Sequence, residues 1–80
     1  MDDAEEQRLR VLRAIRLAQN EWAQVLAVVA ASPDDASAVT GLRARFDLDE
    51  TQAEAVLATP FRRLSRVHRE QVRSELGIDP

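Results

Sequence analysis

The 80-residue sequence lacks cysteine, tyrosine and lysine, and it has only two glycines, one tryptophan and two phenylalanines. Without cysteine a disulfide bond is excluded, and the single histidine cannot supply a structural zinc site. Two glycines leave no glycine-rich loop for a nucleotide phosphate. A core of this size is marginally stable without such a staple. We therefore expect no metal or cofactor, and we expect a partner chain to bury additional surface.

Long apolar runs are also missing. The longest, Val25 to Ala31, falls far short of the roughly 20 residues of a membrane-spanning helix. The chain opens with Met-Asp-Asp rather than a basic stretch, so we expect a cytoplasmic protein without a membrane partner. Fourteen acidic residues against eleven arginines give a net charge of −3, which provides no overall attraction to phosphate.

The residues that are present favour helices. Apolar residues make up 45% of the chain, which predicts a compact all-α domain. Asp3 followed by Glu6 has the form of a helix N-cap, and nothing interrupts the helix before Ser32-Pro33. This predicts one helix over residues 4–31, about 40 Å long. Its apolar positions fit a coiled-coil seam and the core face of a helical hairpin equally well. They are Val11, Ile15, Ala18, Trp22, Val25 and Val29.

Two further helix starts follow. Ser32-Pro33 with Asp35 is typical of a capped start, so a second helix is predicted to about Arg45. Asp49 followed by Gln52 repeats the signature for a third helix.

Proline and glycine delimit the last part of the chain. Thr59-Pro60 should end the third helix, and Pro60 can begin a short turn. Ser65 offers a cap for a last helix through about Leu76, closed by Gly77. We therefore predict a single helical domain. Its parts are a long arm (1–31), a head of short helices (32–64), and a returning helix with a tail (65–80).

The order of motifs in the middle of the chain resembles a known family. The runs are Gly41-Leu42-Arg43-Ala44-Arg45-Phe46, Leu48, Glu50-Thr51-Gln52-Ala53-Glu54-Ala55-Val56-Leu57 and Arg63-Leu64-Ser65. They resemble the A subunits of bacterial DNA gyrase and topoisomerase IV, at the exit gate on the tip of the coiled-coil arms. The resemblance extends from Ala14 to about Val72. It implies a descending arm, a globular head that pairs with its two-fold mate, and an ascending arm.

The residues present predict a non-catalytic protein. Topoisomerase cleavage uses a tyrosine, and this chain has none. The first hypothesis is a homodimeric interaction module. The second is a regulator that binds the gyrase or topoisomerase IV A subunit by mimicking its gate. The apolar residues expected to supply the partner interface and the head core are Leu42, Phe46, Leu48, Val56, Leu57 and Phe61.

Three departures from the family pattern bear on these expectations. Asp47 replaces a glycine, and aspartate tolerates left-handed geometry better than most residues. The segment 58–61 departs from the usual residues close to the family's dimer seam, so partner choice can differ. His68 replaces the glutamate of a capping box after Ser65, which weakens that cap.

The sequence gives little support to a hydrolase, a cation-binding protein or a chorismate mutase. No strand-turn motif presents a serine to His68, so a hydrolase triad is not expected. Asp34-Asp35 and Asp47-Asp49-Glu50 are explained by helix capping and the helix dipole rather than by a cation. Small helical chorismate mutases also begin with a long helix, but their site uses a lysine.

One basic feature remains. On a helical wheel, four arginines fall within about 60° of one another. These are Arg62, Arg66, Arg69 and Arg73. They suggest either a solvated face, paired in part with Glu70 and Glu75, or a contact with DNA phosphate or an acidic partner. The DNA contact would make the chain a small DNA-associated protein. A helix break at Ser65 would remove Arg62 from this stripe. The arginines of the first helix, Arg8, Arg10, Arg13 and Arg16, spread over more than one face and indicate a solvated arm.

Overall fold

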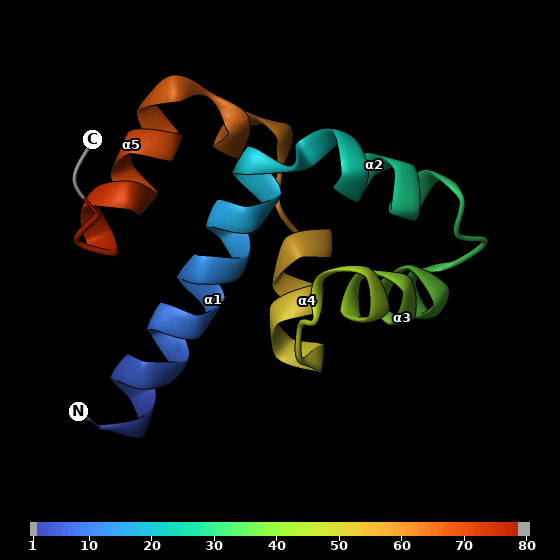
Figure 1. The fold of residues 1–80 in the computed structure, drawn as a ribbon, viewed down its shortest axis with the longest axis horizontal. Helices are drawn as coiled ribbons and strands as arrows, with labels where there is room; N and C mark the ends of the chain where they lie inside the picture. The colour runs from blue at the N-terminus through green and yellow to red at the C-terminus, as the bar shows by residue number, and fades with distance from the viewer. Residues whose placement is uncertain (1, 79–80) are drawn as a thin grey trace.

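The computed structural model describes residues 2–78, which form five α-helices and one 3-10 helix and contain no β-strand. The predicted all-α class is confirmed. In chain order the elements are α1 (Asp3–Asn20), α2 (Trp22–Ala30), α3 (Asp35–Phe46), α4 (Glu50–Leu57), η1 (Phe61–Leu64) and α5 (Arg66–Glu75). Figure 1 shows α1 crossing the molecule with α5 on one side and α4 on the other, while α2 lies over α3.

The prediction of one helix over residues 4–31 is wrong. The chain turns at Glu21, which separates α1 from α2 (Figure 1). Glu21 has φ −118° and ψ 31°, although its N–H still donates to the Leu17 carbonyl at 2.8 Å. Neither proline nor glycine stands at the turn, so the usual local causes of a kink do not apply. The turn allows α1 to pack against α4 and α5 while α2 packs against α3. The predicted 40 Å arm is replaced by an 18-residue helix, about 27 Å long.

Two helix starts differ from the sequence prediction. The N-cap of α1 is Asp2 rather than Asp3, and its carboxylate accepts a backbone N–H three residues along. Helix α3 is capped in the same way by Asp34, not Ser32. The Ser32 hydroxyl instead donates to the Val28 carbonyl in the last turn of α2. In both starts the second aspartate of a pair enters the first helical turn, where its charge favours the helix dipole.

Most of the remaining boundary signals behave as predicted. Asp49 and Gln52 form a reciprocal capping box at the start of α4. Asp47, which ends α3, has φ 55° and so takes the left-handed conformation that aspartate tolerates better than most residues. Gly77 closes α5 with φ 72°. Ser65 occupies the N-cap position of α5, but its side chain makes no capping hydrogen bond.

Thr59-Pro60 ends α4 and leads into η1. Proline cannot donate a backbone hydrogen bond, and it restricts the residue before it to extended geometry. Buried Gln19 on α1 donates from Nε2 to the Arg63 carbonyl at 2.7 Å, which holds η1 against α1. The position of η1 is therefore determined both by the local break at Pro60 and by a contact with the distant helix α1.

The core consists of two small clusters. Leu42, Ala53 and Val56 are buried with two alanines of α1, and this cluster joins α1, α3 and α4. The second cluster packs Val72 of α5 on two apolar residues of α1, so α5 returns beside α1 as predicted. Helices α2 and α3 approach closely at Gly41, where an added Cβ would lie 2.9 Å from Cγ1 of Val28.

Within the described residues, no helix has the length and apolar character needed to cross a membrane.

Candidate partner-binding site

The six apolar residues predicted for the interface and head core divide into three groups. Leu42 and Val56 are buried inside the monomer, so they belong to the core and are not accessible to a partner. Phe46, Leu48 and Leu57 are partly buried and pack against that core. The remaining residue, Phe61, is 81% exposed.

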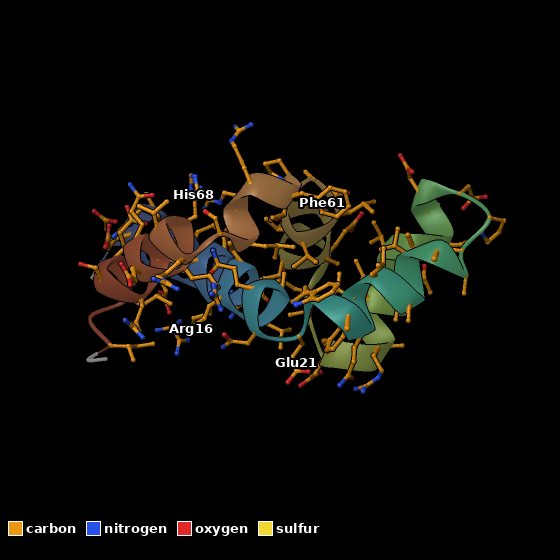
Figure 2. The ribbon with its side chains drawn as sticks, turned by 90° about the horizontal axis from the view of Figure 1, so that it is seen from above. Arg16, Glu21, Phe61 and His68 are labelled. Carbon is orange, nitrogen blue, oxygen red and sulfur yellow. The ribbon has the colours of Figure 1, made fainter. Side chains whose placement is uncertain are left out.

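Phe61 lies beside a groove lined mainly by apolar side chains, with a cavity volume of about 180 Å³. The residues of this apolar groove that matter most are Trp22, Leu26, Val29, Leu57, Phe61 and Leu64. They come from α2, the end of α4, and η1, three segments brought together by the turn at Glu21 and the break at Pro60. Figure 2 shows Phe61 on η1 at the surface of the molecule.

Two large residues of the apolar groove are absent from the predicted interface set. Trp22 is 52% exposed and Leu26 is 46% exposed, one helical turn apart on α2. On a continuous helix Trp22 would lie on the core stripe. The turn at Glu21 gives α2 a new orientation, which leaves this part of the stripe at the surface. No local signal in the sequence indicates the turn.

Contacts of one arginine hold α2 against α3. Arg45 of α3 donates to the Gln24 side chain of α2. The same guanidinium lies over the ring of Phe46, 5.1 Å from its centroid. Such contacts fix α2 on α3 and leave less of Phe46 for a partner.

Asp34 and Asp49, at the starts of α3 and α4, form hydrogen bonds that stabilise the fold. Asp49 forms an ion pair with Arg10, and Gln52 donates from Nε2 to the Arg10 carbonyl, so α4 is tied to α1. Hydrogen bonding by Arg10, and then by the Gln52 backbone N–H, holds the pKa of the Asp49 carboxyl below its usual value. A backbone hydrogen bond from Ser37 likewise lowers the pKa of Asp34. Among residues 2–78, no cluster of histidine and carboxylate side chains could hold a metal ion.

The four arginines predicted to form a stripe do not stay together. Arg62 lies in η1, because α5 starts only after Ser65. The other three, Arg66, Arg69 and Arg73, line a polar cavity between α1 and α5. His68 lies on the other side of α5 from this cavity, and its partly buried ring has no hydrogen-bond partner at Nδ1 among the described residues (Figure 2). The predicted loss of Arg62 on a helix break is confirmed.

Comparison with known proteins shows similarity to the A subunit of DNA gyrase. The A subunit of DNA gyrase from Streptococcus pyogenes serotype M1 is 36% identical over 73 residues, which are 91% of this chain and 9% of that protein. The corresponding protein of Nocardioides sp. is 38% identical over 72 residues, or 90% of this chain and 8% of that protein. That of Streptococcus pneumoniae serotype 4 is 33% identical over 70 residues, with similar shares of 88% and 8%. No protein-family model matches the chain.

The chain is thus a small helical domain homologous to a short segment of the gyrase A protein, and it spans under a tenth of the length of these relatives.

Proposed function

We propose that this gyrase A-related helical domain is a non-catalytic dimerisation module that resembles the exit gate of type IIA topoisomerases. In this proposal two copies pair through the apolar groove. The observation that carries it is the exposure of Phe61 beside that groove.

The distribution of apolar side chains supports a partner. Four of the nine buried apolar residues are alanines, whereas the single tryptophan and one of the two phenylalanines are more than half exposed. The accessible surface is 5,401 Å², while about 4,900 Å² is expected for a compact monomer of 9.0 kDa. Large apolar side chains at the surface and small ones in the core are typical of a domain that buries its surface against another chain.

The shape of the groove favours a second copy as that partner. A two-fold interface brings a surface patch against its own duplicate, so a projection and a receptacle on one patch complement each other. Phe61 supplies the projection, and the cavity of about 180 Å³ supplies the receptacle. A dry cavity of about 150 Å³ accommodates a benzene ring. In the proposed dimer the phenyl ring of each copy enters the groove of the other.

Truncating Phe61 measures how much its side chain contributes to the free energy of dimerisation. A well-packed aromatic at an interface centre contributes about 2 kcal/mol or more on truncation. Both copies are changed in a two-fold dimer, so Phe61→Ser should weaken pairing by about 4 kcal/mol, or roughly 1,000-fold. Val67 provides a matched control, because it is apolar, 65% exposed and outside the groove.

Sedimentation equilibrium across micromolar concentrations, with the emission of Trp22, is the direct test. The native chain and Val67→Ser should sediment at twice the 9.0 kDa chain mass. Phe61→Ser should sediment as a monomer with unchanged helicity. The emission of Trp22 should shift to shorter wavelength as the dimer forms, because the indole lies in the groove. A dimer that is insensitive to Phe61 would place the interface elsewhere.

A native chain that stays monomeric would contradict self-pairing. The similarity to the gyrase A protein makes that protein the alternative partner, bound by the same apolar groove as a gate mimic. Mixing the monomer with the gyrase A protein should then give a complex that Phe61→Ser abolishes and Val67→Ser preserves.

A further inference from the structure

A second surface collects positive charge from two helices distant in sequence. Arg16 from the second half of α1 joins Arg66, Arg69 and Arg73 of α5 around one cavity of about 190 Å³. We call this the arginine cavity. Figure 2 shows Arg16 on the side of the molecule away from His68. The sequence indicates only a solvated arm for Arg16, whereas the packing of α5 on α1 brings it beside three arginines of the predicted stripe.

None of these four arginines forms an ion pair within the described part of the chain. The ion pairs of residues 2–78 join Arg8 to Glu5 and Arg10 to Asp49, and neither involves the arginine cavity. One carboxylate, Glu70, lines the cavity beside the four guanidinium groups. The local net charge is therefore +3 on a protein whose total is −3. An anion bound there would relieve the repulsion among the arginines.

We propose that the arginine cavity binds the phosphate backbone of duplex DNA. The planar guanidinium group matches phosphate oxygens with paired N–H donors. Arg66 and Arg73 are two helical turns apart, about 10 Å along α5, which is longer than one phosphate group and favours a chain of phosphates over a single phosphate ion. No aromatic side chain lines the cavity, so it offers no stacking platform for the bases of a single strand. The site does not depend on whether the apolar groove pairs two copies.

Fluorescence anisotropy with a labelled 20-base-pair duplex tests the proposal. Three net charges predict a salt slope of about −2.7, so binding should weaken about 40-fold between 50 and 200 mM NaCl. The double variant Arg69→Gln/Arg73→Gln should lower the slope by about 2. The control is Arg13→Gln/Arg62→Gln, which removes the same charge from two exposed arginines outside the cavity and should leave the slope unchanged.

Glu70→Gln makes the test independent of any folding defect, because it should tighten duplex binding about five-fold by removing the one negative charge in the cavity. An equal loss of duplex affinity in the two double variants would mean that binding depends only on the total number of arginines, and it would overturn the site. Absence of duplex binding at 50 mM NaCl would also overturn it. Binding of inorganic pyrophosphate or polyglutamate without duplex binding would contradict the DNA assignment.

Discussion

Replacing Gly41 with alanine should destabilise the protein even though alanine is the better helix former. The propensity gain in a helix interior is about 0.8–1.0 kcal/mol. Against it, the new Cβ would lie 2.9 Å from Cγ1 of Val28, closer than a carbon contact allows. Val28 is branched at Cβ and keeps one preferred rotamer in a helix, so relief requires α2 and α3 to separate. Overpacking of this kind costs about 1–3 kcal/mol. We expect a net loss of about 1 kcal/mol.

The double-mutant cycle with Val28→Ala isolates this contact. Once Val28 is shortened, the methyl group at position 41 has room, so Gly41→Ala should stabilise by about 1 kcal/mol. The coupling energy is then about 2 kcal/mol. Urea unfolding followed by circular dichroism measures all four chains, at one protein concentration because pairing also adds stability. Equal effects of Gly41→Ala in both backgrounds would refute the close approach of α2 and α3.

Three further predictions concern stability. Leu42→Ala, at a side chain with no exposed surface, should cost about 2.7–5 kcal/mol in urea unfolding; a cost below about 1 kcal/mol would contradict its place in the core. Asp47→Gly should add about 0.5–1 kcal/mol, because glycine removes the strain of φ 55°, and no change in the thermal midpoint would mean the aspartate is unstrained there. The lowered pKa values of Asp34 and Asp49 mean that their stabilisation is present above the ordinary aspartate pKa and is lost as pH falls through the lowered value in the folded protein. The urea concentration at the unfolding midpoint should therefore decrease as the pH is lowered below about 4. The decrease should be smaller in Asp34→Asn/Asp49→Asn, where asparagine still caps both helices. An identical decrease in both chains would assign the acid sensitivity to other groups.

The helix boundaries in the second half were predictable because their causes are local. A capping box needs only residues three apart, as at Asp49 and Gln52. Pro60 ends a helix through its own ring, and Gly77 adopts a positive φ without steric cost. The shift of the α3 start from Ser32 to Asp34 shows the limit of such signals, since two residues competed for one cap position.

The partner surfaces were only partly predictable. Phe61 and three of the arginines are identifiable from the sequence, whereas Trp22, Leu26 and Arg16 are not assigned to either surface by it. Arg16 precedes the turn at Glu21, and its place at the cavity depends on the packing of α5 on α1. Trp22 and Leu26 lie after the turn, within the predicted straight helix over residues 4–31. A helical wheel assigns a face correctly only as long as the helix axis continues.

Residue types and short-range hydrogen bonding account for the all-α class and for most helix ends. These features were therefore accessible without a structure. The division of the apolar residues between core and surface, and the gathering of four arginines at one cavity, required the folded chain. The exposure of Trp22 and Leu26 depends on the turn at Glu21, and the gathering of the arginines depends on the return of α5 beside α1. Those features are favoured by burial of side chains from distant segments, which no local window of sequence contains.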